Sequence, residues 1–226
     1  MKIVGIVKSS LIDYPKKAST VIFLGGCNFR CGFCHNPEIV YNKAESIIEI
    51  DELFDFLEKR KRFIDAVCIS GGEPTIHPSL TELIKKIKDK GFAVKLDTNG
   101  TNPKMLKKLL EGNLVDYVAM DIKGPFEKYK AIVGCDVDIG VIKESASLLI
   151  SNKYEDFDYE FRTTLARELL NESDLDKMIK EHPGAKKWYL QTFKNPGTIL
   201  DQEGSYSAYT KSEMEEMGKS LCVNVR

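Results

Sequence analysis

The 226-residue sequence has no apolar run long enough to span a membrane, no excess of charge of either sign and no apolar leader at its start. No stretch approaches the roughly 20 apolar residues that a bilayer-spanning helix needs, so we exclude membrane insertion. The 33 basic residues are balanced by 34 acidic ones, which leaves no concentrated positive charge for binding nucleic acid. Charge already appears at Lys8 and Asp13, too early for the apolar core of a secretory signal. We therefore expect a cytoplasmic protein.

The sequence also lacks internal repeats, low-complexity tracts and a recognisable linker. A chain of this length buries roughly 70% of the surface that its unfolded form exposes, and one α/β domain is the simplest arrangement. We expect a single domain over residues 1–226 with a core at about residues 20–191. Residues 1–17 are expected to add a strand or hairpin at one edge, and residues 195–226 to form a tail with a helix from about Ser212.

Short β-branched or apolar runs alternate with longer amphipathic ones along the chain. This alternation is typical of repeated strand–helix units with a parallel sheet, and it predicts six such units. The expected strands are Thr20–Leu24, Ala66–Ser70, Phe92–Asp97, Val115–Asp121, Asp158–Leu165 and Lys187–Gln191. The expected helices are Asp51–Lys61, Leu80–Lys90, Pro103–Leu110, Val141–Ser151 and Ser173–Glu181.

Three of the six cysteines lie within eight residues, directly after the first predicted strand. Disulfides are not expected, because thiols in the cytosol are kept reduced. The spacing CxxxCxxC lets one loop wrap a cubane and supply one thiolate to each of three irons, while Gly32 permits a close backbone turn. No fourth cysteine lies nearby. The sequence therefore predicts a [4Fe–4S] cluster on Cys27, Cys31 and Cys34, with one iron left to bind a small molecule.

Three other interpretations of this stretch remain open. A zinc ion would have to take both Cys34 and His35, and adjacent residues reach two corners of one tetrahedron only with difficulty. The fragment from Cys31 to His35 matches CxxCH, the attachment motif of c-type haem, although haem attachment normally follows export. In the third interpretation, the three thiols form no common site and are unrelated buried or redox-active groups. The cluster accounts best for all three cysteines in a chain without an export signal.

Three more polar motifs follow the next three predicted strands. Ser70-Gly71-Gly72-Glu73-Pro74 ends the second strand, Asp97-Thr98-Asn99-Gly100 the third and Asp121-Ile122-Lys123 the fourth. Each has a plain structural explanation, as a turn, a strand-end cap or a surface ion pair. Because the carboxyl ends of strands in a parallel barrel share one face, where such enzymes build their active sites, we expect these motifs and the cysteine loop to meet in one pocket.

On these motifs, with Phe33 placed just before Cys34, the chain resembles the radical S-adenosylmethionine (SAM) superfamily over roughly residues 20–191. It is most similar to the small activating enzymes of glycyl-radical proteins, notably those of anaerobic ribonucleotide reductase and pyruvate formate-lyase. Cys34-His35-Asn36-Pro37 and the two aspartate motifs carry that closer match. The resemblance implies a partial (β/α)6 TIM-type barrel, the radical SAM fold, with a lateral opening for a loop of a partner protein.

The resemblance also implies a reaction and a set of contacts. SAM would chelate the free iron through its amino and carboxylate groups, and one electron would cleave it into methionine and a 5′-deoxyadenosyl radical. The cofactor, not a side chain, would then abstract hydrogen. Gly71 and Gly72 would admit the methionyl amine beside an anionic Glu73, Lys123 would suit the SAM carboxylate, and Asp121 the ribose. A monovalent cation is implied at Asp97, Thr98 and Asp121, and further cofactor contacts at Phe33, Asn99, Arg162 and Gln191.

Two differences from related activating enzymes bear on the substrate. The formate-lyase relatives carry a histidine on the last strand, where Trp188–Phe193 offers none. Many glycyl-radical activases insert an additional cluster module after the first motif, but no cysteine lies between Cys34 and Cys68 here. We therefore expect an oxidoreductase that installs a glycyl radical on an anaerobic ribonucleotide reductase, with a flavodoxin or ferredoxin as electron donor. The rivals are a small-molecule radical SAM enzyme similar to 7-carboxy-7-deazaguanine synthase and a non-enzymatic iron–sulfur electron carrier.

The remaining cysteines and histidines are expected to serve structure. Cys68 lies inside an apolar strand and is expected in the core, while Cys135 and Cys222 receive no role. His77 and His182 are expected to be ordinary loop residues, and His35 to lie near the cofactor.

Overall fold

Six parallel strands with helices between them form the centre of the chain, and a further strand extends the sheet at each edge. The computed structural model describes residues 1–151, 153–154, 157–194 and 197–226. The strands follow one another across the sheet in chain order, β1 being antiparallel and all others parallel. Their bounds are β1 Ile3–Ser10, β2 Ser19–Leu24, β3 Ala66–Gly71, β4 Ala93–Thr98, β5 Tyr117–Asp121, β6 Asp158–Leu165, β7 Trp188–Thr192 and β8 Asn224–Val225.

The helices lie mainly in the connections between these strands. They are α1 Pro37–Val40, α2 Ile50–Arg60, the 3-10 helix η1 Pro74–Ile76, α3 Leu80–Asp89, α4 Pro103–Glu111, α5 Tyr129–Val133, α6 Ile139–Ile150, α7 Glu172–Glu181 and α8 Lys211–Ser220. The six expected strands and five expected helices are confirmed, each with ends within two residues of the predicted ones. The edge strand β1 and the C-terminal helix α8 are confirmed as well, although the tail's expected first residues, 195–196, lie outside the described part.

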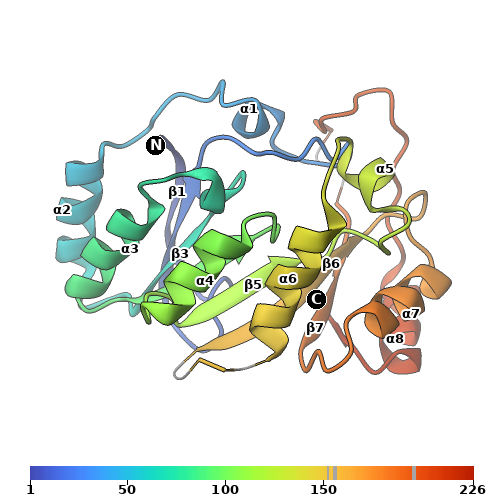
Figure 1. Ribbon diagram of the computed structural model, residues 1–226. Helices are drawn as coiled ribbons and strands as arrows, with labels where there is room; N and C mark the ends of the chain where they lie inside the picture. The colour runs from blue at the N-terminus through green and yellow to red at the C-terminus, as the bar shows by residue number, and fades with distance from the viewer. Residues whose placement is uncertain (152, 155–156, 195–196) are drawn as a thin grey trace.

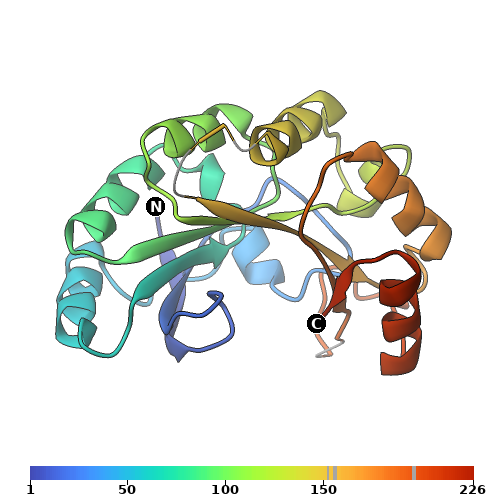
Figure 2. The same cartoon turned by 90° about the horizontal axis from the view of Figure 1, so that it is seen from below.

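The sheet bends into an arch, with the larger helices on its convex side (Figures 1 and 2). The predicted apolar stripe of α3, Leu80, Leu83, Ile84 and Ile87, is buried against the sheet. Helix starts follow ordinary capping chemistry: the Asn102 side chain accepts a hydrogen bond from the Met105 N–H at the start of α4. The partial barrel of radical SAM type is thus confirmed at the level of strand order and layering.

The concave side of the arch has a small apolar base below a charged interior. The base comprises Tyr14, Val21, Ala66, Cys68 and Tyr117. Cys68 is 1% exposed, which confirms it as a core residue. Higher in the arch, charged residues of β4, β5 and β6 replace apolar ones, and these strands end at the face that carries the expected site.

The two edges of the sheet lie on either side of the opening of the arch. The segment between β1 and β2 holds one side, and β7 with the C-terminal strand β8 holds the other (Figure 2). β8 was not predicted, because two residues are too short for a periodic signal. Within the part of the chain that the structure describes, no helix is long and apolar enough to cross a membrane.

Candidate active site

The cysteine loop leads from β2 into the short helix α1 and folds back against it. The backbone N–H groups of Gly26 and Cys27 donate to the carbonyl oxygens of Ile39 and Val40 at 2.7 and 3.2 Å. Cys31 is buried, and Cys27 and Cys34 are partly buried. All three line one cavity of about 270 Å³ at the carboxyl ends of the strands.

Arg30 holds the carbonyl groups of this loop from within. Its Nη1 donates to the carbonyl oxygens of Cys27 and Phe29 at 2.6 and 2.7 Å, and its guanidinium lies over the ring of Tyr41. Helix α5 supports the loop from the other side, because the Arg30 N–H donates to the Val133 carbonyl oxygen at 2.8 Å. These contacts support the loop from both sides.

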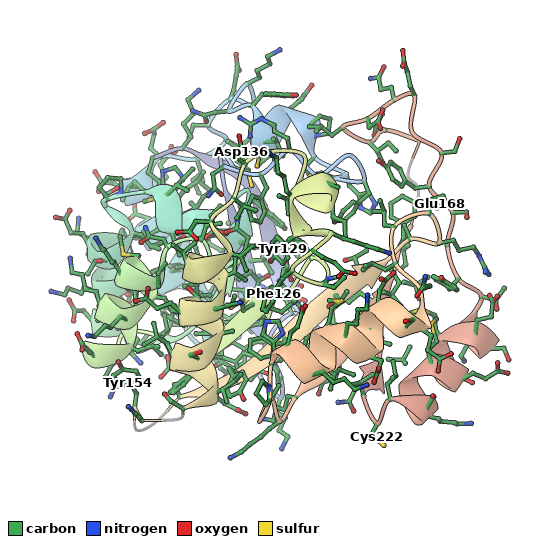
Figure 3. All side chains as sticks on the ribbon, turned by 45° about the vertical axis from the view of Figure 1, so that its right-hand side comes forward. Phe126, Tyr129, Asp136, Tyr154, Glu168 and Cys222 are labelled. Atoms are coloured by element: carbon green, nitrogen blue, oxygen red, sulfur yellow. The ribbon has the colours of Figure 1, made fainter. Side chains whose placement is uncertain are left out.

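Tyr129, near the middle of the molecule in Figure 3, connects α5 to the end of β5. Its side chain is fully buried and packs edge-on against Phe29. Its hydroxyl accepts a hydrogen bond from the Lys123 N–H at 3.4 Å. The cysteine loop and the Asp121–Lys123 motif are thereby positioned by one aromatic side chain.

A C-terminal segment, residues 200–206, covers the cysteine loop. The N–H groups of Leu200 and Asp201 each donate at 2.9 Å, to the carbonyl oxygens of Cys34 and Gly32. A Cβ on Gly32 would overlap the Tyr206 hydroxyl, so a larger residue at this position would displace the Tyr206 side chain. Tyr206 also packs edge-on against Phe33. We call residues 200–206 the covering segment.

Gly71 and Gly72 join the end of β3 to the start of the cysteine loop. Gly71 has φ of +116°, a conformation that favours glycine. The Gly72 N–H donates to the Leu24 carbonyl oxygen at 2.9 Å, and a Cβ on Gly72 would overlap the backbone of Gly26. Both glycines line the cavity, but the close contact that requires them is with the protein's own backbone.

Glu73 is fully buried and ties the loop after β3 to the loop after β4. Its carboxylate accepts hydrogen bonds from the Thr75 N–H at 3.0 Å, the Thr98 hydroxyl at 2.7 Å and the Asn99 N–H at 2.6 Å. Burial raises the pKa of Glu73, and these donors oppose that shift. Asn99 in turn donates through Nδ2 to Asn28 Oδ1 at 2.9 Å, which links the motif after β4 to the cysteine loop.

Five charged side chains form a continuous series, and all of them except Lys95 line the cavity. Lys95 pairs with Asp97, Arg162 bridges Asp97 and Asp121 at 3.2 and 2.8 Å, and Lys123 pairs with Asp121 at 3.0 Å. Burial alone raises the pKa of Asp97, but Arg162 and Lys95 outweigh it and hold that pKa at about 2. Burial alone lowers the pKa of Lys123, but the Asp121 carboxylate outweighs burial and raises that pKa above its ordinary value. Both carboxylates stay ionised under ordinary conditions.

The comparison with known families agrees with this geometry. The model of the radical SAM superfamily matches residues 21–180, well over half of the chain. The chain belongs to the radical SAM superfamily. Membership implies a [4Fe–4S] cluster and SAM as cofactors, as the motifs predicted.

Similar sequences include proteins named as activating enzymes. MJ1227 of Methanocaldococcus jannaschii, provisionally named a glycyl-radical enzyme activating enzyme, is 40% identical over 220 residues, 95% of this chain and 89% of its own. The pyruvate formate-lyase-activating enzyme of Clostridium pasteurianum is 32% identical over 139 residues, 59% and 57% of the two chains. Among solved structures, Streptococcus suis SuiB bound to precursor peptide SuiA has a TM-score of 0.72 at 12% identity, covering 91% of this chain and 48% of SuiB. This last likeness concerns the fold alone.

The three cysteines fit the radical SAM cluster better than a single metal ion. Among residues 1–151, 153–154, 157–194 and 197–226, no three His, Cys, Asp or Glu side chains converge on one ion position. A cubane does not require such convergence, because each thiolate binds a different iron. With one flexible glycine and a common cavity, Cys27, Cys31 and Cys34 offer three separate thiolates around one space.

Cluster loading in this radical SAM protein is expected to depend on pH. Burial raises the pKa of Cys27 to about 11 and that of Cys31 to about 12, whereas iron binds thiolates, so each thiol must release a proton. At limiting iron and sulfide, anaerobic reconstitution should therefore incorporate more cluster at about pH 9 than at about pH 7. Bound iron and sulfide per chain measure this, with thermal unfolding as a control for the fold. Loading that falls with pH would contradict the expectation.

The structure gathers most of the predicted site residues around one cavity and leaves two outside it. The cavity wall includes Phe33, Gly71, Gly72, Asp97, Thr98, Asn99, Asp121, Lys123 and Arg162 together with the three cysteines. Glu73 faces the protein interior, and Gln191 lines a second cavity in the arch. His35 lines the site and packs on Phe193, while His182 is buried among aromatic rings at the end of α7.

Several residues that shape the radical SAM site were not singled out from the sequence. They include Arg30, Lys95, Tyr129 and the covering segment. The local signals of the covering segment's turn are Gly204 and Asp201, whose side chain accepts hydrogen bonds from the Glu203 and Gly204 N–H groups. Of the two cysteines without a predicted role, Cys135 donates to the Asn28 carbonyl oxygen beside the cysteine loop. Cys222 is exposed, at the opposite end of the molecule from Asp136 (Figure 3).

Proposed function

We propose that this radical SAM enzyme activates a glycyl-radical enzyme, most specifically an anaerobic ribonucleotide reductase, by removing a hydrogen atom from a glycine Cα. The observation that carries the proposal is a second, larger cavity of about 570 Å³ in the arch. Arg162 lines both cavities, so they adjoin at this side chain. A segment that enters the arch from its open side would thus reach the cofactor site. The names of the relatives support the same reaction class.

The walls of the second cavity come from both sides of the opening. Residues 11–16 lie on one side, and Gln191, Thr192 and Arg226 on the other. Leu11 and Ile12 are 82% and 88% exposed, which offers two aliphatic side chains to a segment of another protein at the opening. An extended segment that carries glycine suits such a narrow space, because glycine brings its Cα close without a side chain.

When bound, the cluster would supply the electron that cleaves SAM. The cleavage would give methionine and the 5′-deoxyadenosyl radical that takes the hydrogen atom. The residues of this chain bind and orient. Lys95, Arg162 and Lys123 outnumber Asp97 and Asp121 by one positive charge, so this wall attracts the SAM carboxylate.

The remaining cofactor contacts follow from the same wall. Asp121 has an ionised carboxylate beside the cavity and suits the ribose hydroxyls, while Gly71 and Gly72 leave room for the methionyl group. A reducing cluster at the low end of the potential range needs a low-potential donor. For this reason we assign the electron supply to a flavodoxin or a ferredoxin.

The proposal is tested by electron paramagnetic resonance on anaerobic, reduced holoenzyme mixed with SAM and candidate glycyl-radical proteins. A glycyl-radical doublet on an anaerobic ribonucleotide reductase is expected, together with 5′-deoxyadenosine. The Cys27→Ala variant is the matched control and should give neither. A holoenzyme that cleaves SAM yet yields no doublet with any glycyl-radical protein would refute the activase assignment.

The two rival functions give different results in the same experiment. A small-molecule enzyme similar to 7-carboxy-7-deazaguanine synthase would cleave SAM and modify its small substrate, with no doublet on a protein. An electron carrier would form no 5′-deoxyadenosine at all. The ion-paired wall beside the cysteines disfavours the carrier, because electron transfer alone needs no anion-attracting pocket.

A further inference from the structure

Lys95 is a buried lysine that points into the charged interior of the arch. It lies on β4 two residues before Asp97, so both side chains project from the same face of the strand. Its side chain is 3% exposed, and its ammonium pairs with Asp97 Oδ1. A lysine buried this deeply is uncommon unless its charge is paired, which indicates a specific role for this ion pair.

The carboxylate oxygens next to Lys95 already have cationic partners. Asp97 Oδ1 binds Lys95, and Asp97 Oδ2 binds Arg162 at 3.2 Å. Asp121 Oδ1 binds Arg162 at 2.8 Å, and Asp121 Oδ2 binds Lys123 at 3.0 Å. A metal cation at this place would have to share each carboxylate oxygen with one of these positively charged groups.

The charge balance also opposes an added cation. Three positive side chains face two carboxylates, so these five side chains by themselves carry one excess positive charge. A sodium or potassium ion would raise this excess, whereas the SAM carboxylate would neutralise it. The residues Asp97, Thr98 and Asp121 therefore do not fit the monovalent cation that the family resemblance implied.

We propose that the Lys95 ammonium is the built-in cation of this cofactor site, and that the enzyme consequently binds and cleaves SAM without sodium or potassium. Lys95 is a positioning residue: it holds Asp97, Asp97 holds Arg162, and Arg162 holds the Asp121 carboxylate beside the cofactor cavity. The inference goes beyond the proposed activation reaction, since it concerns SAM binding and applies to any substrate.

The first test measures SAM affinity of the reconstituted wild-type holoenzyme in sodium, potassium and tetramethylammonium buffers of equal ionic strength. The dissociation constants are expected to agree within about twofold. A loss of affinity of about tenfold or more in tetramethylammonium, restored by sodium or potassium, would overturn the proposal.

The second test asks whether the loss of Lys95 makes SAM binding depend on sodium or potassium. Lys95→Met leaves Asp97 Oδ1 without its ammonium, so SAM binding should weaken by about tenfold in tetramethylammonium and recover in sodium or potassium. Lys95→Arg keeps the charge and should stay independent of the cation. Lys88→Met removes a lysine that pairs with Asp116, away from the cofactor cavity, and is the matched control. A Lys95→Met holoenzyme with wild-type affinity in every buffer would overturn the proposal.

A third measurement needs neither cluster nor activity. Crystals of cluster-free wild-type protein soaked in rubidium are expected to show no anomalous scattering peak at the Asp97 and Asp121 carboxylates. Its thermal midpoint should differ by no more than about 1 °C between potassium and tetramethylammonium. This experiment decides if Lys95→Met does not fold. A rubidium ion bound to either carboxylate would refute the proposal. The absence of such an ion, together with cation-independent SAM binding, would support the proposal.

Discussion

Replacing Cys27, Cys31 or Cys34 with alanine is expected to reduce SAM cleavage to the background rate. Each thiolate holds a different iron, and the cofactor rather than a side chain performs the chemistry, so no neighbouring group compensates for a missing ligand. All three side chains line the same cavity. The measurement is 5′-deoxyadenosine formed after reduction under anaerobic conditions, together with iron and sulfide per chain.

Cys68→Ala is the control within the same chain. Cys68 is 1% exposed in the apolar base of the arch, so its loss should lower the free energy of unfolding by about 1 kcal/mol and leave SAM cleavage intact. Cys222→Ala, at an exposed thiol, should change neither quantity. Full SAM cleavage in a variant that lacks one of the three loop cysteines would contradict the cluster assignment.

Arg162→Met is expected to cause the largest loss of stability among the variants of the charged wall. Its guanidinium bonds to Asp97 and Asp121 and is 14% exposed, and removal leaves two neighbouring carboxylates short of positive charge. Breaking such a buried arrangement costs about 3 kcal/mol, equivalent to a fall of about 10 °C in the thermal midpoint. SAM binding should weaken as well, because the wall loses its excess positive charge.

The matched control and the pH dependence separate this effect from a general loss of charge. Arg167→Met removes an exposed ion pair with Glu213 and should leave the thermal midpoint close to that of the wild type, because solvent screens such pairs. In the wild type the lowered pKa of Asp97 stabilises the fold above the unfolded value of about 4, and this contribution is lost as pH falls through about 2. Arg162→Met should therefore unfold at a higher pH on acidification. Identical acid unfolding of the wild type and Arg162→Met would contradict the bridge that Arg162 forms between Asp97 and Asp121.

The barrel could be predicted from the sequence because its signals are periodic and local. Alternation of apolar and amphipathic segments located six strands and five helices, and motifs at strand ends located the site, since parallel strands end on one face. The cysteine spacing is a chemical signal that needs no knowledge of distant contacts. For these reasons the cavity contains Cys31, Asp97 and Lys123 as expected.

The unpredicted features depend on contacts between distant segments. Glu73 reads as an exposed anion in its motif, but donors from the loop after β4 draw its carboxylate inward. Lys95 looks like an ordinary strand lysine until the fold buries it beside Asp97, which Arg162 of the distant strand β6 also binds. The covering segment has no periodicity, so only the fold brings its backbone to Cys34. No pattern within a single segment contains such information.

The strand order has one further consequence. Because β1 and β8 are the two margins of the sheet and do not pair with each other, the interior faces outward along one whole side. A target can approach the reactive centre without first being unfolded and threaded through a ring. The same opening would also admit dissolved oxygen to a bound cluster, so tolerance of air and tolerance of a bulky target are opposing demands on one gap.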